Sequence, residues 1–131
     1  MSGYVLDDLA LIAGLTDDGA EHHRRELSRL LAAAIDRRPA IAIPALCLAS
    51  AAVRRPAIAG HLAELVTGGP IGAIEIVGLS RTALVAQLRT EHPRLSWPAL
   101  HAASTAATIR VPIVTIDPAR YADTAVEAIP L

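Results

Sequence analysis

The sequence contains no phenylalanine and no lysine, and aromatic residues make up only 2% of its 131 residues. The core must therefore close mainly through Leu, Ile, Val and Ala, whose small side chains suit helices packed closely on a sheet better than a large aromatic cavity. All 12 basic residues are arginines, and the formal net charge of −1 excludes a global positive field that would attract nucleic acid non-specifically. Any contact with RNA must therefore be local.

Cysteine is nearly absent as well. Cys47 is the only one, which excludes an internal disulfide, and its apolar neighbours Leu46 and Leu48 predict a buried thiol rather than a nucleophile. The first residues lack the basic region and the apolar stretch of a signal peptide. The apolar run at residues 39–53 is shorter than the roughly 20 residues that a spanning helix needs. We therefore expect a cytoplasmic protein without a membrane segment.

Short apolar segments separated by helical stretches predict five strands, at residues 4–6, 40–43, 73–77, 111–116 and 126–129. One-sided apolar spacing predicts an amphipathic helix at residues 18–38. Two further helices are expected at residues 44–53 and from residue 56 to about residue 66, and a helical turn is expected at residues 118–121. Two more are expected to begin at serine N-caps, one after Ser80 and one from Ser96 to about Thr108. Strands so connected pair in parallel through right-handed crossovers. The sequence therefore predicts one α/β domain over residues 1–131, a three-layer α/β/α sandwich with a central parallel sheet.

Acidic residues follow two of the predicted strands, at the sheet edge where ligand sites of open parallel sheets form. Asp7 and Asp8 come directly after the first strand, and Asp117 follows the fourth. If these strands are neighbours, Asp7 and Asp117 converge on one divalent cation such as Mg²⁺, which takes oxygen ligands and keeps several waters. An Asp in front of a helix is also a common N-cap, so the spacing leaves both roles open.

Three segments resemble the sequence motifs of PIN domains. Residues 5–11 (VLDDLAL) look like the first-strand motif, residues 43–51 resemble the second motif, and residues 114–117 (VTID) resemble the last one, a strand that ends in Thr-x-Asp. The motifs occur in the family's order, with helices between them, and together span nearly the whole chain. Residues 44–51 and 97–102, with the alanine-rich composition, are similar to PIN-like proteins of GC-rich actinobacteria. The resemblance implies a PIN-like fold.

The resemblance also implies an activity, because PIN domains are typically Mg²⁺- or Mn²⁺-dependent single-strand ribonucleases, many of them toxins neutralised by a small antitoxin. Asp7 and Asp117 match family acids, which implies catalytic and metal-binding roles, and Thr115 matches the hydroxyl residue that often accompanies the last acid. The family Glu is replaced by Ser50. Ser96, or Pro98 after a shift of two residues, stands where the family carries another Asp.

These departures from the family's acids fall on its functional positions. Replacing carboxylates by serine hydroxyls removes negative charge and a general base, whose help is typically worth ~10²–10⁴ in rate. Asp8 adds one carboxylate beside Asp7, but neighbours on an extended strand point to opposite faces, so Asp8 reaches the site only if the chain bends there. We therefore expect a PIN-like domain that is a weakened or inactive nuclease and acts in binding or regulation, with RNA, an antitoxin or another protein as partner.

Two alternatives stay open. The first is a working Mg²⁺- or Mn²⁺-dependent endoribonuclease of the toxin type that uses Asp7, Asp8 and Asp117. The second is a protein-interaction homodimer, in which alanine-rich helices form the interface and the acids serve only as caps. Only the first alternative requires a metal ion for activity, so the absence of a metal requirement would exclude it.

Other residues near these segments have ordinary structural roles as their first interpretation. Arg54 and Arg55 end a predicted helix, where paired arginines are commonly a solvated charge, although they could also contact a phosphate backbone or an acidic partner. Trp97 stands near the expected cleft and could stack on a base. A packed and hydrogen-bonded state is favoured for His101 over a role in the site.

Overall fold

Five parallel strands form one sheet in the order β3-β2-β1-β4-β5. The computed structural model describes residues 3–36 and 39–131. The strands are β1 (Gly3–Leu6), β2 (Ala40–Pro44), β3 (Ile74–Val77), β4 (Ile113–Thr115) and β5 (Ala128–Pro130). The predicted α/β class with a central parallel sheet is confirmed. All five predicted strands are found, although the fourth is shorter than expected and the fifth begins two residues later than expected.

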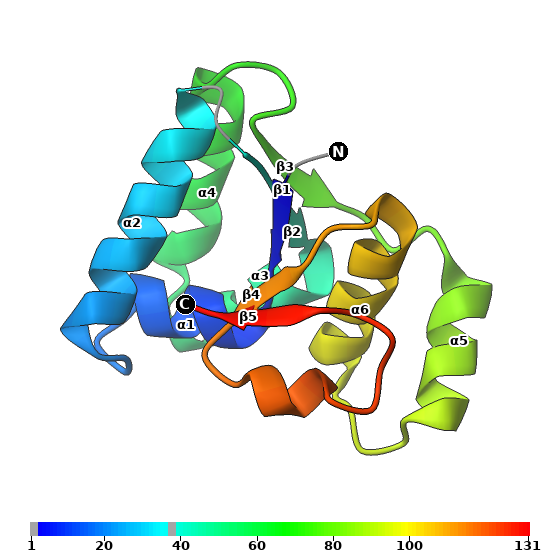
Figure 1. Ribbon diagram of the computed structural model, residues 1–131. Coiled ribbons are helices and arrows are strands. Elements are labelled where there is room, and N and C mark those ends of the chain that lie inside the picture. The colour runs from blue at the N-terminus through cyan, green and yellow to red at the C-terminus, as the bar shows by residue number, and fades with distance from the viewer. Residues whose placement is uncertain (1–2, 37–38) are drawn as a thin grey trace.

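Helices cover both faces of this sheet and complete the three-layer sandwich (Figure 1). The connections contain α1 (Asp8–Leu15), α2 (Glu21–Ile35), α3 (Ala45–Arg54), α4 (Ala57–Gly68), α5 (Thr82–Glu91), α6 (Trp97–Ile109) and the 3₁₀ helix η1 (Pro118–Tyr121). In Figure 1, α2 and α4 lie on one side of the sheet, α6 and α5 lie on the other, and α1 and α3 cross the edge where the first two strands end. None of the helices in the described ranges is long and apolar enough to cross a membrane.

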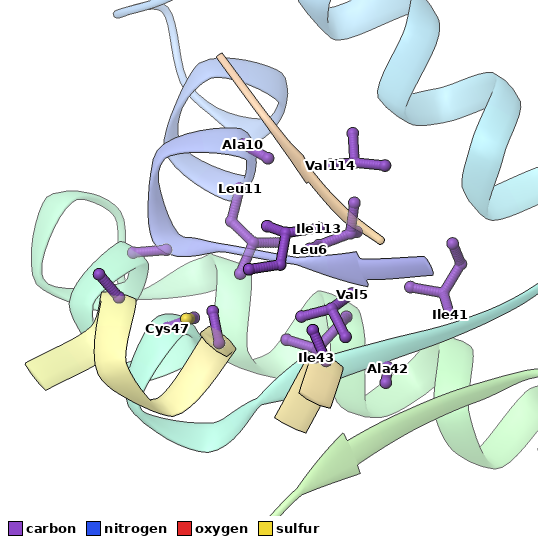
Figure 2. Packing of buried hydrophobic residues seen from close by; sticks show 14 of the residues in the cluster. Val5, Leu6, Ala10, Leu11, Ile41, Ala42, Ile43, Cys47, Ile113 and Val114 are labelled. Carbon is purple, nitrogen blue, oxygen red and sulfur yellow. The ribbon is translucent and has the colours of Figure 1, made fainter. Parts of the chain in front are cut away.

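The core consists of small and branched apolar side chains. Val5, Leu6, Ile43 and Ile113 from three neighbouring strands are fully buried, and Figure 2 shows them packed with Leu11 and Cys47 from the helices. Helix α6 is buried over most of its length because it lies between the sheet and helices α3 and α5. Its alanines keep the helix surface flat and allow this close approach.

Helix α1 was not predicted. Its residues are apolar almost all round, since it packs on α2 and α3 and against β4. A helix buried on every side has no one-sided periodicity, which is the signal used to recognise a helix in a sequence. The consequence for the site is large, because the chain leaves the sheet at Asp7 rather than continuing as an extended loop.

Other helix boundaries differ by a few residues. Helix α2 begins at Glu21 rather than at residue 18, and the expected end at Arg38 lies outside the described residues. Ser80 is not the N-cap of α5, which begins at Thr82 after Arg81 in the cap position. Ser96 is the N-cap of α6 as predicted, with its Oγ accepting a hydrogen bond from the amide of Ala99 at 3.3 Å.

Strands β1 and β4 lie side by side at the centre of the sheet. Val5 pairs with Ile113 and Leu6 with Val114. From β1 the chain proceeds to β2 and β3 on one side, whereas β4 is followed by β5 on the other side. The carboxyl ends of the strands at such a reversal, here β1 and β4, are the usual place for a ligand site in an open α/β sheet. The two strands that precede Asp7 and Asp117 are therefore neighbours.

Candidate functional site

The chain turns from strand to helix at Asp7. Asp7 is the N-cap of α1, and its Oδ1 accepts a hydrogen bond from the amide of Ala10 at 2.8 Å. Asp8 is the first helical residue, so its side chain no longer follows the alternation of an extended strand. The bend required for Asp8 to join Asp7 is thus present, and both carboxylates contact the same guanidinium group.

That guanidinium belongs to Arg120 of η1. Its Nη1 lies 2.7 Å from Asp8 Oδ1 and 3.3 Å from Asp7 Oδ2, and its Nη2 donates to Ser96 Oγ at 2.7 Å. The Asp7 side chain is fully buried, the Asp8 side chain is 8% exposed and the Arg120 side chain is 15% exposed, so water screens these ion pairs little. We call Asp7, Asp8, Arg120, Ser96 and Tyr121 the acid–arginine cluster.

Tyr121 completes the cluster from the interior. Its hydroxyl donates to Asp7 Oδ2 at 2.7 Å, and the residue is 1% exposed. Arg120 and Tyr121 reach the carboxylates because η1 begins directly after β4, with Pro118 in its first turn, and the amide of Arg120 donates to the carbonyl of Asp117 at 3.1 Å. The short helix thus supplies a cation and a hydroxyl donor to two carboxylates on the neighbouring strand end.

The environment shifts the pKa values of Asp7, Arg120 and Tyr121. Burial raises the pKa of Asp7, against hydrogen bonds from the Ala10 amide, Thr115 and Tyr121 that lower it. Burial opposes the charge of Arg120, but the hydrogen bond to Asp8 and the nearby negative charges raise its pKa overall. Burial and the charge of Asp7 raise the pKa of Tyr121. Arg120 therefore stays a cation and Tyr121 stays a hydroxyl donor at physiological pH.

The remaining predicted site residues lie around this cluster. Asp117 is exposed, and its side chain makes no capping hydrogen bond at η1. Thr115 is fully buried, and its Oγ accepts a hydrogen bond from the Asp117 amide at 3.2 Å. Ser50 is half-buried on α3. The structure thus brings together Asp7, Asp8 and Ser96, and leaves the Asp117 carboxylate outside the hydrogen bonds of the cluster.

The donor set can be compared with the needs of a divalent cation. Mg²⁺ and Mn²⁺ bind through free carboxylate and other oxygen ligands. Within residues 3–36 and 39–131, no group of three or more His, Cys, Asp or Glu side chains could hold a metal ion. The oxygens of Asp7 and Asp8 already accept hydrogen bonds from Arg120, Tyr121 and Ala10. In this arrangement a guanidinium lies between the carboxylates that a cation would need, so the residues do not fit a cation as they stand.

Two residues next to the cluster are packed as predicted. His101 is 2% exposed; its Nδ1 accepts from the Leu46 amide at 3.3 Å, and its Nε2 lies 3.3 Å from the carbonyl of Gly78. Burial lowers the pKa of His101, in accord with a neutral ring that bridges two strand ends. Cys47 is fully buried, its Sγ donates to the Pro98 carbonyl at 3.2 Å, and burial raises its pKa well above the ordinary value. Neither residue has the properties of a nucleophile or base.

Arg120 and Tyr121 are the site residues that sequence reasoning missed. The available signal was weak: an Asp-Pro pair after a strand predicts a helical turn, which places the next side chains at the same sheet edge. Both side chains contact buried carboxylates at the end of the neighbouring strand, and no local sequence pattern indicates these contacts.

Comparison with models of known protein families finds no match for this chain. Comparison with curated proteins finds no significantly similar sequence. The likeness to PIN domains therefore rests on the three motifs of this chain.

Proposed function

We propose that this chain is a PIN-like domain that works by binding, in which the acid site is a weakened or inactive form of a Mg²⁺- or Mn²⁺-dependent ribonuclease site. The observation that carries the proposal is the position of Arg120, whose guanidinium contacts both Asp7 and Asp8. Hydrolysis assisted by a cation needs carboxylates free to hold the ion and a base free to accept a proton from water. Both carboxylates are engaged by hydrogen-bond donors instead.

The other predicted positions do not supply the missing groups. Ser50 and Ser96 carry hydroxyls, which bring neither negative charge nor a base, and Ser96 is itself bonded to Arg120. Asp117 is the remaining acid at the neighbouring strand end, and it is exposed to solvent. We therefore expect this edge of the sheet to bind divalent cations weakly or not at all.

A partner surface at the same edge is supported by exposed apolar side chains. Trp97 is 51% exposed and follows Ser96, and Ile116 is 41% exposed and follows Thr115. Arg89 lies over the Trp97 ring at 4.3 Å from its centroid, which holds the indole in place on the surface. We propose a protein partner in the cytoplasm, of the antitoxin kind or another, with a second copy of this chain as the alternative.

A working endoribonuclease is the second candidate function. In its favour, Asp7 and Asp8 converge at the carboxyl end of β1, and the Asp117 strand lies beside it. This function requires Arg120 to leave the carboxylates when RNA binds, so that Asp7 and Asp8 become available. The cost is high because two buried carboxylates would lose their cationic partner.

Calorimetric titration of Mg²⁺ and Mn²⁺, with single-stranded RNA cleavage assayed on the same samples, tests the proposal. The wild type is compared with Asp7→Asn/Asp117→Asn and with Asp123→Asn, a matched change of an exposed acid outside the cluster. We expect no saturable binding at millimolar cation and intact RNA in all three proteins. Saturable binding and cleavage that are lost only in the double variant would establish the nuclease and overturn the proposal.

A further inference from the structure

A separate cavity lies at the other end of α1, away from the acid–arginine cluster. It has a volume of about 300 Å³ and is bounded by the last residues of α1, the loop that follows, the start of α2 and the corner between α3 and α4. Its polar lining comes from Thr16, Asp17, Arg24, Arg55 and His61. This volume is at the small end of the range for ligand sites, which suits a small molecule better than a polymer.

The two arginines of this cavity are held in place by backbone carbonyls. Arg24 Nη1 donates to Gly19 O at 2.8 Å and to Thr16 O at 3.5 Å, and Arg55 Nη1 donates to Leu15 O at 3.0 Å. A carbonyl orients a guanidinium without cancelling its charge, and each guanidinium has five N–H donors in a planar fork. Both side chains are therefore pre-oriented cations with donors remaining for a ligand.

The nearby acids do not cancel these charges. None of the salt bridges among the described residues involves Arg24 or Arg55. Asp18 is paired with Arg54 at 3.1 Å, which leaves Asp17 as the acid that lines the cavity. Two guanidinium groups thus face one carboxylate, and the balance inside the cavity is positive.

The start of helix α4 forms one wall of the cavity. The cavity is lined by Ala57 and Ile58 at the start of this 12-residue helix, and by His61 one turn later. Ile58 and Ala57 also supply an apolar wall, against which the non-phosphate part of a ligand can pack.

From this combination we propose that the cavity binds a small phosphate monoester, with the phosphate held between Arg24 and Arg55 and the body of the ligand against the start of α4. Paired guanidinium forks match the doubly charged phosphate better than a single carboxylate. The site is independent of the acid–arginine cluster, since it shares no residue with it. A free mononucleotide and the 5′-phosphate end of an RNA present the same chemistry.

Calorimetry and amide chemical-shift mapping on the full chain test this site. The probes are inorganic phosphate, adenosine 5′-monophosphate, adenosine, and a short RNA with either a 5′-phosphate or a 5′-hydroxyl. We expect the monophosphate to bind with a dissociation constant below about 1 mM and to shift the amides of Thr16, Ile58 and His61, and adenosine to cause no such shifts. No binding of the monophosphate at about 10 mM, or equal binding of adenosine, overturns the proposal.

Variants separate the cavity from a general surface effect. Arg24→Gln/Arg55→Gln is expected to weaken monophosphate binding at least about tenfold, whereas Arg25→Gln, an exposed arginine of the same helix outside the cavity, leaves it unchanged. Equal loss in both proteins contradicts the assignment. The source of the ligand follows from the RNA probes: tighter binding of the 5′-phosphorylated RNA than of the mononucleotide identifies an RNA end, and weaker binding identifies a free mononucleotide.

A second variant tests the charge balance without removing the arginines that support the cavity wall. Arg24 and Arg55 hold the 15–19 loop, so their removal could loosen the cavity wall. Asp17→Asn removes the opposing charge without touching either arginine, and we expect it to tighten monophosphate binding about twofold. An unchanged or weaker affinity in a folded Asp17→Asn protein overturns the proposed charge balance.

Discussion

Helix α1 begins beside two carboxylates and ends beside two guanidinium groups. At its start, Asp7 and Asp8 both contact the single guanidinium group of Arg120, so each carboxylate has a partner inside the protein. At its end, Arg24 and Arg55 donate to backbone carbonyls, which fix their position and leave their charge uncompensated. A charged group that is paired internally stabilises or specifies a fold, whereas a fixed and unpaired one is available to a ligand. We propose from this comparison a structural role for the carboxylates at the start of α1 and a ligand-binding role for the arginines at its end.

The largest expected effect comes from removing the cation at the start of α1. Arg120→Ala leaves two buried carboxylates without their partner, and breaking a buried ion pair from one side costs about 3–5 kcal/mol. Chemical denaturation should show this loss of unfolding free energy, with Arg25→Ala as an exposed arginine control. A change of less than about 1 kcal/mol, the range of exposed pairs, would mean that the carboxylates are not held by Arg120 in solution.

The next largest effect is expected near the end of α1, at Gly14. A Cβ added at Gly14 would lie 2.6 Å from Leu27 Cβ of α2 and closer still to its Cδ2, so Gly14→Ala forces the two helices apart. Overpacking of this kind typically costs about 1–3 kcal/mol. Gly60→Ala is the control, because nothing lies within 4 Å of its added Cβ, and it should stabilise α4 by about 0.5–1 kcal/mol. Thermal unfolding of the two variants should therefore move in opposite directions.

A smaller effect is expected at the rim of the acid–arginine cluster. Ser96→Ala removes the N-cap bond to Ala99 and the acceptor for Arg120 Nη2. Loss of an N-cap costs typically about 1 kcal/mol. A double-variant cycle with Arg120→Ala should show coupling, because both changes remove the same hydrogen bond. Additive losses of unfolding free energy would show that Ser96 and Arg120 do not stabilise the protein together.

The smallest expected effect is a pH-dependent one at Asp7. Its folded pKa is raised by burial above the ordinary 3.8, so the unfolded chain releases this proton first, and the contribution of Asp7 to stability is lost as pH rises through the folded pKa. Asp7→Asn cannot ionise and keeps an oxygen for the Ala10 amide. Its stability relative to the wild type should therefore improve between pH 4 and pH 7. Denaturation curves at these two pH values measure the difference, and a shift in favour of the wild type would show that the folded pKa is lowered instead.

Much of the fold could be predicted from the sequence because its strands are short apolar runs and its amphipathic helix α2 shows a clear periodicity. The parallel arrangement followed from the length of the connections. Helix α1 could not be predicted, since its burial on all sides removes the periodic signal. The prediction of Ser80 as the N-cap of α5 was wrong for a different reason. Several polar residues precede α5, and local propensity does not decide which of them takes the cap position.

The candidate site, like the fold, could be predicted only in part from the sequence. The sheet edge and the positions of Asp7, Asp8 and Ser96 were accessible, because strand ends and caps are local features. The pairing of both carboxylates with Arg120 was not, since it joins residues more than 100 positions apart and depends on the bend created by the unpredicted helix α1. The interpretations of Arg55 as a solvated charge, a phosphate contact or a contact to an acidic partner stay predictions, since the structure adds only its hydrogen bond to the Leu15 carbonyl.

In the proposed function, Arg120 is the counter-ion of Asp7 and Asp8 in place of a metal ion. Paramagnetic broadening of backbone amide signals by Mn²⁺, recorded for the wild type and for Arg120→Gln, tests it most directly. We predict no localised broadening in the wild type at millimolar Mn²⁺, and broadening centred on the amides of Asp8, Ala10 and Tyr121 in the variant. Saturable broadening at these amides in the wild-type protein would contradict the account, whatever the variant shows.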